Sequence, residues 1–351
     1  MKKMKGLMQA AIVIVYILLV WTIIIPLIAT WILYRYLFDK RCDKTEGVLT
    51  AADYPNLDCS AFRVKSGKEE LACFEYRDKE KCTGRAVVLV SHGIGCSHGN
   101  YLNRINYFAE RGYIVLGFDM TGCGDSTGSG IKGLPQAHVD LDKVLTYIEN
   151  SPEYGNLPLL VYGHSWSGFG VASVLNYGHK PVAVVSASGF NRERSIIRFQ
   201  AVRMAGRLGV LTMPWFAVIE RFIYGKRAAY TAVSGINAYG GPVLLAHSKD
   251  DPTVPYDCSV IAAEGITNRK VQKLVYEDRG HTLSRSVEAE NTIKADVAGK
   301  PRRKIRKGES YFKYEVDVHY HYSARETVFD TDVTFMDKVE NFYESALKGE
   351  L

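Results

Sequence analysis

The sequence predicts an α/β fold: a mostly parallel β-sheet flanked by helices, with a short helical cap and an N-terminal transmembrane helix. Two observations support the sheet. Short apolar runs, typical of strands buried on both faces, recur after residue 60, and segments with helical periodicity alternate with them. A third observation predicts the membrane helix, because residues 6–34 contain no charged side chain.

The composition is that of a folded globular protein. The chain has 351 residues, of which 47% are hydrophobic and 23% are charged. These values exclude wholesale disorder, collagen-like repeats and a multi-span membrane protein. The length allows one large domain or two of medium size. Seven scattered cysteines do not indicate a disulfide scaffold. No Cys-x-x-Cys or Cys/His pair has the spacing of zinc ligands, so we expect no structural metal site.

The uncharged stretch at residues 6–34 would be about 44 Å long as a helix, whereas a bilayer core of about 30 Å needs roughly 20 residues. A cleaved signal peptide is the alternative, but its apolar region would span only about 7–15 residues. We therefore predict an uncleaved anchor over residues 1–38 and a linker over 39–60. Pro26 would kink this helix. Aromatic residues typical of a membrane interface crowd its second half: Trp21, Trp31, Tyr34 and Tyr36.

The orientation of the anchor depends on its flanking charges. Three lysines precede the apolar stretch, and four basic residues follow it within residues 35–44. Counted this way, the positive-inside rule gives almost no bias. We predict the N-terminus inside and the main domain outside the cytoplasm, because that is the usual outcome for a basic N-terminus followed by an anchor.

The domain over residues 61–351 begins with a hairpin, because two short strand-like runs flank Ser66-Gly67-Lys68. The predicted strands are 61–65, 71–76, 86–90, 113–118, 159–162, 182–185, 242–246 and 271–276. The predicted helices are 100–111, 135–150, 166–177 and 331–347. Active sites of such folds lie at the carboxyl ends of the strands.

Ser165 is the candidate nucleophile. The sequence Gly163-His164-Ser165-Trp166-Ser167 follows a predicted strand and precedes a predicted helix, which is the context of a nucleophile elbow. Small residues on both sides of the serine allow the sharp turn, and the helix N-terminus stabilises developing negative charge. Ser167 stands where the usual pattern has glycine, and we expect serine to be tolerated there.

Ser165 requires a base, and the base requires an acidic residue that orients it. His281 follows the last predicted strand, and two adjacent aspartates, Asp250 and Asp251, follow the strand before it. We predict Asp251 as the partner of His281, with Asp250 as the alternative. The order Ser165, Asp251, His281 is the order found in α/β-hydrolases. The backbone N–H groups of Ile94 and Trp166 are the predicted oxyanion donors.

Together these residues resemble the α/β-hydrolase superfamily, and within it the branch of monoacylglycerol lipases and serine aminopeptidases (S33). The resemblance spans about residues 60–285. Its motifs are residues 92–95, 118–126, 163–168, the loop of Asp251 and Gly280-His281. It implies a cap between the sixth and seventh strands, and a structural role for Asp119 in its loop. Cys96 and Cys123 would lie near the pocket mouth, either as small loop residues or as reactive thiols.

Two segments depart from the plain pattern. The cap, about residues 190–232, holds eight basic residues and two acidic ones among apolar residues. It would cover an apolar pocket and lie on an anionic membrane surface, or present a solvated basic face. A charged insertion, about residues 284–329, contains a basic run at 300–307 and a period-2 strand at 312–323. On that strand, His319 and His321 are either a solvated pair or metal ligands.

The formal net charge of +6 is unevenly distributed. Outside residues 1–44, 190–232 and 284–326, the chain holds 19 basic and 27 acidic residues, so the scaffold itself is acidic. The basic segments favour a membrane surface as partner, and we expect no nucleic acid.

The sequence therefore predicts a membrane-anchored serine hydrolase that cleaves carboxylic esters of the monoacylglycerol or lysophospholipid kind without a cofactor. Amide or peptide substrates are the alternative within enzymes. A non-catalytic interaction module bound to the membrane is the alternative outside them.

Overall fold

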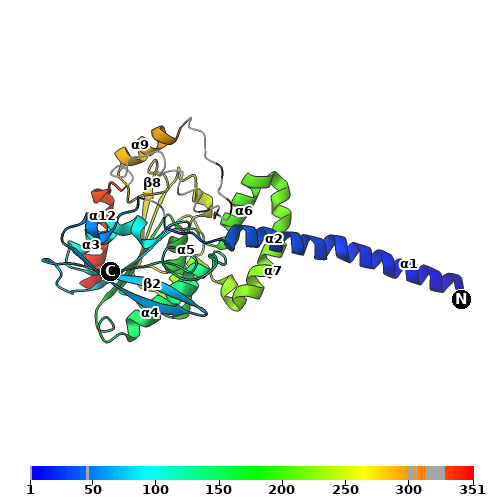
Figure 1. Ribbon diagram of the computed structural model, residues 1–351, viewed down its shortest axis with the longest axis horizontal. Helices are drawn as coiled ribbons and strands as arrows, with labels where there is room; N and C mark the ends of the chain where they lie inside the picture. Colours follow the sequence, from blue (N-terminus) through cyan, green and yellow to red (C-terminus); the bar gives the residue numbers. More distant parts are fainter. Residues whose placement is uncertain are drawn as a thin grey trace.

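The computed structural model describes residues 2–44, 47–298 and 329–351, together with residues 304, 307, 309, 310 and 312. One sheet of eight strands organises the domain, in the order β1-β2-β4-β3-β5-β6-β7-β8 (Figure 1). β1 pairs antiparallel with β2, and β2 with β4, whereas all other neighbours are parallel. The strands are β1 Leu57–Ser66, β2 Glu69–Asp78, β3 Val87–Ser91, β4 Ile114–Phe118, β5 Leu159–His164, β6 Ala183–Ala187, β7 Val243–Ser248 and β8 Val271–Tyr276.

All eight predicted strands and the hairpin are confirmed. The prediction was too short for β1 and β2, because polar residues extend both strands beyond their apolar centres. The four predicted helices are also present. They are α3 Leu102–Ala109, α4 Gln136–Asn150, α5 Trp166–Ser173 with the 3₁₀ turn η4 Val174–Tyr177, and α12 Val333–Leu347.

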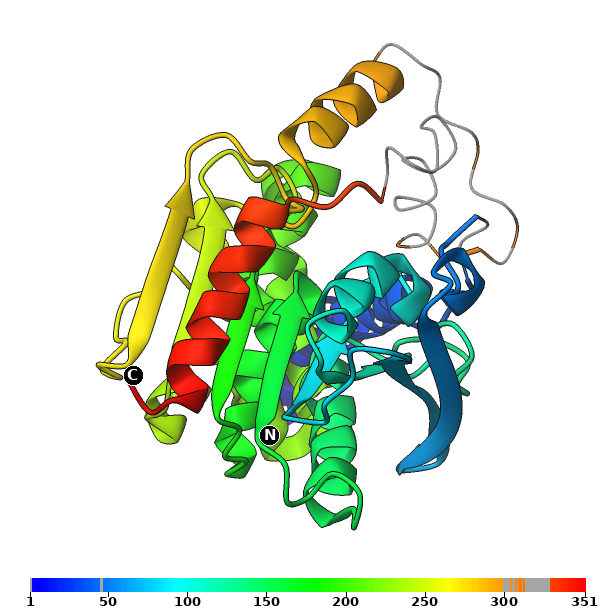
Figure 2. The ribbon, with the colours of Figure 1, turned by 90° about the vertical axis from the view of Figure 1, so that its left-hand side faces the viewer.

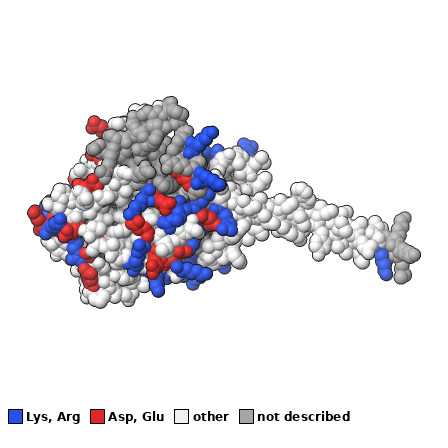
Figure 3. Space-filling view, in the orientation of Figure 1, with Lys and Arg blue, Asp and Glu red and all other residues white. Residues whose placement is uncertain are grey.

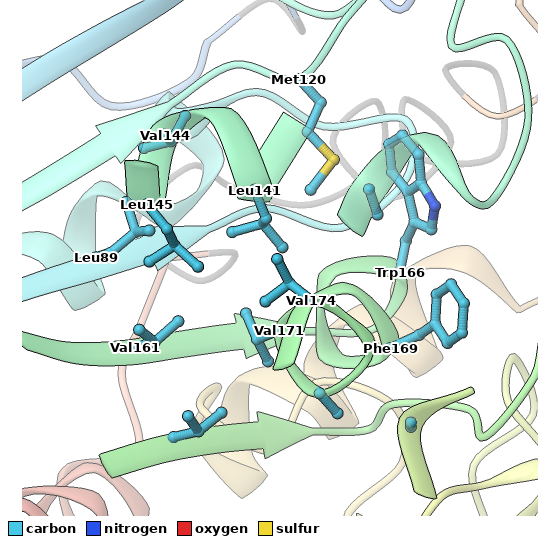
Figure 4. Packing of buried hydrophobic residues seen from close by; sticks show 14 of the residues in the cluster. Leu89, Met120, Leu141, Val144, Leu145, Val161, Trp166, Phe169, Val171 and Val174 are labelled. Atoms are coloured by element: carbon cyan, nitrogen blue, oxygen red, sulfur yellow. The ribbon is translucent and has the colours of Figure 1, made fainter. Parts of the chain in front are cut away.

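The strands from β3 to β7 are buried on both faces, and their successive side chains enter two separate cores. Val87 and Leu89 of β3 belong to the core beneath α4 and α5, whereas Val88 and Val90 belong to the core beneath α3 and α12. Figure 2 shows α3 and α12 on one face of the sheet, and Figure 4 shows the packing beneath α4 and α5. Each such side chain contributes about 1.5–3 kcal/mol to the free energy of folding when it is fully buried. Because helices cover both faces of the sheet, the side chains on both sides of these strands must be apolar, which explains the unbroken apolar runs.

The cap lies between β6 and β7. It consists of α6 Glu193–Ala205, η5 Gly206–Thr212, α7 Met213–Tyr224 and η6 Gly225–Ala229, and α8 Ala232–Tyr239 leads from it to β7. Positive φ angles at Gly206 and Gly225 end α6 and α7. The stretch Glu193–Tyr239 contains an 18-residue window with a mean hydropathy of 1.2, which is high enough for a membrane span. However, α6 has 13 residues and α7 has 12, whereas crossing a bilayer takes about 20.

The N-terminal helix is continuous and projects from the domain (Figure 1). It comprises α1 Lys2–Leu19, a π-helical turn at Val20–Ile24 and α2 Ile25–Phe38. Pro26, at which a kink was predicted, follows this π-helical turn. Proline lacks an N–H group, and its ring displaces the carbonyl four residues earlier. The stretch Met4–Phe38 contains an 18-residue window with a mean hydropathy of 2.9 and is long and apolar enough to cross a membrane.

The charged insertion leaves and re-enters the domain at one place, because Arg285 and Thr331 form an isolated β-bridge. It contains a helix that the sequence analysis did not predict, α9 Val287–Val297, whose Ser286 caps the N-terminus by accepting from the Ala289 N–H. The basic run at 300–307 falls largely outside the described residues. The predicted strand at 312–323, including His319 and His321, lies outside them except for Phe312.

Candidate active site

Ser165 lies at the turn between β5 and α5 in a strained conformation, with φ 61° and ψ −117°. Non-glycine residues adopt such angles only where the surrounding structure imposes them. The turn is tight because a Cβ atom on Gly163 would approach the Ser167 carbonyl to 2.4 Å. Ser167 itself is anchored, because its hydroxyl donates to the Ser91 carbonyl at 2.6 Å and accepts from the His164 N–H at 3.0 Å. The structure thus gives the serine at this position a bonding role that glycine cannot have.

The structure brings Ser165, His281 and Asp251 together in one hydrogen-bonded chain. His281 Nε2 lies 2.9 Å from Ser165 Oγ, and its Nδ1 lies 2.7 Å from Asp251 Oδ2. Because a carboxylate can only accept, Nδ1 carries the proton and Nε2 is free to accept the proton of Ser165. Asp251 is buried, and its other oxygen accepts the N–H groups of Thr253 and Val254. The arrangement is that of a nucleophile, a base and the acid that orients the base.

Asp250, the alternative partner of His281, occupies a different place. One of its oxygens accepts the Gly280 N–H at 2.8 Å and the Ser248 hydroxyl at 2.6 Å. These hydrogen bonds hold the pKa of Asp250 below its usual value, although partial burial opposes the shift. Asp250 therefore positions the loop that carries His281, whereas Asp251 contacts the imidazole ring.

A second chain of hydrogen bonds, which the sequence analysis missed, ends at the backbone carbonyl of His281. The Gly93 N–H donates to the Tyr101 hydroxyl at 2.9 Å, and that oxygen lies 2.7 Å from His164 Nδ1. His164 Nε2 lies 3.0 Å from the His281 carbonyl, so Nε2 must be the donor. Burial and the nearby His281 lower the pKa of His164 well below its usual value, which keeps the ring neutral. The Ser188 hydroxyl also donates to the His281 carbonyl, at 2.7 Å.

The predicted oxyanion donors flank Ser165, the candidate nucleophile. Trp166 is the first residue of α5, and the first N–H groups of a helix have no intrahelical partner. Ile94 follows Gly93, whose close packing leaves no room for a side chain, because a Cβ atom there would lie 2.9 Å from the Tyr101 hydroxyl. Ile94, Ser165 and Trp166 line one cavity, so both predicted donor residues lie beside the candidate nucleophile.

The cavity above Ser165 has a volume of about 440 Å³ and an apolar lining. Ile196, Ile197 and Phe216 of the cap form one side of it, and Leu33, Leu37 and Phe38 of α2 form another. Among the described residues that line it, none is acidic, and Arg203 is the one basic residue. An enclosure of this size suits the apolar portion of a small lipid. The sequence analysis did not predict that the N-terminal helix reaches this cavity.

The two acidic residues of the cap, Glu193 and Glu220, are buried together behind the cavity wall. Their exposed fractions are 3% and 1%, and one oxygen of each has no hydrogen-bond partner in the described part of the chain. Burial raises the pKa of Glu193 to about 7, although Arg194 and Arg192 partly offset it. Burial and the neighbouring Glu193 raise the pKa of Glu220 well above its usual value. Both carboxyl groups are therefore protonated in a mildly acidic solution.

The raised pKa of Glu193 predicts that the folded cap becomes less stable as the pH rises. Between its value of about 4.3 in the unfolded chain and about 7 in the folded one, the folded state binds the extra proton, so the free energy of unfolding falls with increasing pH. Glu193→Gln should flatten the decrease in melting temperature between pH 5 and 7. Glu264→Gln, at an exposed position, serves as control. Equal slopes in wild type and Glu193→Gln would contradict the assignment.

Comparison with known proteins finds similarity to serine hydrolases of the α/β type. The sequence model of the family "Serine aminopeptidase, S33" matches residues 83–232. A lysophosphatidylserine lipase of Danio rerio (ABHD12) is 27% identical over 189 residues, which cover 52% of this chain and 47% of the relative. An uncharacterised abhydrolase domain-containing protein of Dictyostelium discoideum is 30% identical over 161 residues, which cover 43% of this chain and 16% of the relative. The chain thus spans about half of the first relative's length and a sixth of the second's.

Solved structures share the fold. An esterase from Pyrococcus furiosus superimposes with a TM-score of 0.52 at 17% identity, covering 70% of this chain and 90% of the esterase. An acetyl xylan esterase from Paenibacillus gives a TM-score of 0.51 at 17% identity, covering 67% of this chain and 82% of the enzyme.

The sheet order, the strained serine after β5 and the cap after β6 are those of the α/β-hydrolase fold. The chain therefore has an α/β-hydrolase fold, and the proteins that it is similar to include a lipase and esterases.

Proposed function

We propose that this protein is a membrane-anchored serine hydrolase that cleaves carboxylic esters of lipids through an acyl-enzyme intermediate. The observation that carries the proposal is the hydrogen-bonded chain of Ser165, His281 and Asp251 at the base of an apolar cavity. In this mechanism Ser165 Oγ attacks the acyl carbonyl while His281 Nε2 takes its proton. The Ile94 and Trp166 N–H groups stabilise the oxyanion, and His281 then protonates the leaving alcohol. A water molecule, activated by His281, releases the acyl group from Ser165.

The cavity favours an acyl substrate over a peptide with a free amino terminus. An ammonium group requires an anion beside it, and the described lining residues include no carboxylate. Glu193 and Glu220 are not lining residues, and their raised pKa values favour the neutral form. Arg203 lies in the lining, where it would suit the phosphate of a lysophospholipid. The similarity to a lysophosphatidylserine lipase supports this substrate class.

Membrane anchoring is part of the proposal. The projecting helix shows no charged side chain between its N-terminal end and the domain (Figure 3), and its window of highest hydropathy has none of its residues buried. Protease accessibility of the catalytic domain in intact cells or spheroplasts tests the predicted orientation, with the domain outside the cytoplasm. Full protection of the domain until the membrane is broken would reverse it.

A fluorophosphonate probe tests the nucleophile directly, because it reacts with activated serines. We expect the detergent-solubilised full chain to be labelled, Ser165→Ala to show no label, and Ser60→Ala, at an exposed position on β1, to retain it. Absence of labelling in a folded wild type would favour the non-catalytic alternative. A series of p-nitrophenyl esters beside aminoacyl amides tests the bond class, and faster turnover of the amides would overturn the esterase assignment.

A further inference from the structure

The N-terminal helix is longer than a membrane span requires, and the structure divides it into two parts. Every residue from 4 to 25 is exposed, whereas contacts with the domain begin at Pro26. The exposed part has a helical length of about 33 Å, close to the roughly 30 Å of a bilayer core. The last three turns, residues 26–38, are therefore not needed to cross the membrane.

These last turns pack into the catalytic domain along one face. Thr30, Tyr34 and Phe38 are buried at a spacing of four residues, which places them on the same side of α2. The Tyr34 ring lies 5.6 Å from the ring of Phe216 on α7, centroid to centroid. The Tyr34 hydroxyl donates to the Lys132 carbonyl at 2.8 Å, so α2 is joined to the cap and also to the loop before α4.

The adjoining stripe of the same helix forms part of the cavity wall. Leu33, Leu37 and Phe38 line the cavity that also contains Ser165 and Trp166. Ile32, on the opposite side of the helix, is 63% exposed. The helix thus presents one apolar stripe to the catalytic cavity and another to its surroundings.

The outer part of the cavity lies where α2 meets the cap. Met204 and Leu208, in the α6–η5 corner, line the cavity and yet are 55% and 74% exposed. In Figure 1 the cap helices α6 and α7 lie on the side of the domain from which α1 projects. Exposed apolar side chains at this level are costly in water and are stabilised at a bilayer surface.

We propose that one face of α2, formed by Leu33, Leu37 and Phe38, is a wall of the acyl-chain site. In this arrangement a single acyl chain of a membrane lipid enters at the bilayer surface between α2 and the α6–η5 corner. Leu33 and Leu37 then determine the length of the chain that the cavity accepts. The proposal rests on the proposed ester hydrolysis and adds to it a determinant of specificity that lies outside the hydrolase domain.

A chain-length profile of kcat/KM, measured on p-nitrophenyl esters from acetate to palmitate with full-length protein in detergent, tests the proposal. Leu37→Trp fills the cavity and should lower the ratio of long-chain to short-chain kcat/KM by about tenfold or more, because one methylene in an apolar pocket already changes it by that order. Leu37→Ala enlarges the cavity and should move the optimum toward longer chains. Ile32→Trp adds the same bulk on the exposed face of the same helix and should leave the wild-type profile unchanged.

The outcomes separate this proposal from the proposed function. A wild type that is folded but neither labelled by fluorophosphonate nor active on any ester would contradict the proposed function itself. A wild type active on esters, with both Leu37 variants matching Ile32→Trp across the series, would overturn the role of the helix as a wall. If Leu37→Trp is not labelled and so is not folded at the site, Leu37→Ala decides alone. Exchange of residues 4–25 for an unrelated apolar helix should preserve the chain-length profile. A changed profile would contradict the assignment of residues 4–25 to the membrane alone.

Discussion

Asp251→Asn is expected to lower kcat for ester hydrolysis by about 10⁴ while leaving the fold intact, by analogy with the effect of this substitution in other serine hydrolases. Asp251 Oδ2 accepts the proton-bearing Nδ1 of His281, and this fixes Nε2 as the acceptor that faces Ser165. An amide at this position can donate to Nδ1 instead, which would place the proton on Nε2 and leave Ser165 without a base. Single-turnover kinetics and the rate of fluorophosphonate labelling measure the loss.

Asp250→Asn is the matched control, because it makes the same change of group on the adjacent residue. Asp250 contacts Gly280 and Ser248 and does not contact the imidazole of His281. We expect a decrease of at most about tenfold, from a less well positioned loop. A larger loss for Asp250→Asn than for Asp251→Asn would show that the predicted alternative, and not Asp251, orients the base.

Asp119→Ala should destabilise the domain by about 3–5 kcal/mol, because it removes a fully buried charge from its partners. One carboxylate oxygen accepts the His98 N–H at 2.7 Å and lies 2.8 Å from His98 Nδ1, and the other accepts the Asp125 N–H at 2.8 Å. Alanine would leave these donors buried without an acceptor. Urea unfolding in detergent, followed by tryptophan fluorescence, measures the change.

Asp58→Ala is the control for this prediction, since Asp58 pairs with Lys79 at the surface with 69% of its side chain exposed. We expect this substitution to lower the free energy of unfolding by less than about 1 kcal/mol.

The effect of Asp119 should also depend on pH. Burial opposes its ionisation, but His98 and the hydrogen bonds hold the pKa of Asp119 below its usual value. The stabilisation is therefore present above the unfolded pKa of about 3.9 and is lost as the pH falls further. A wild type and an Asp119→Ala variant of equal stability at pH 7 would refute the structural role.

Much of the fold was predictable because the relevant signals are local. A strand buried on both faces must be apolar throughout, so β3, β4 and β5 were recognisable from their residues. The turn around Ser165 requires small neighbours, and Asp251 and His281 follow strands whose carboxyl ends share one edge of a parallel sheet. Sequence order and strand ends were therefore enough to predict these three residues as a group.

The elements that were missed depend on contacts between distant segments. The chain from Gly93 through Tyr101 and His164 to His281 joins residues up to 188 positions apart, and no local pattern marks it. Glu193 and Glu220 were visible as the two acids of a basic cap. Their burial, however, follows from the packing of α6 and α7 and not from the composition of either helix.

The N-terminal helix shows most clearly what the sequence determined and what the tertiary structure determined. By itself the sequence established an uncharged apolar helix longer than a bilayer needs, because hydrophobicity and length are properties of the residues alone. Only the tertiary structure determined where the residues beyond a membrane span lie. The burial of Tyr34 and Phe38 and the exposure of Ile32 depend on which surface the helix contacts. An apolar side chain gains similar free energy from lipid and from a protein interior, so composition cannot distinguish a membrane span from a cavity wall.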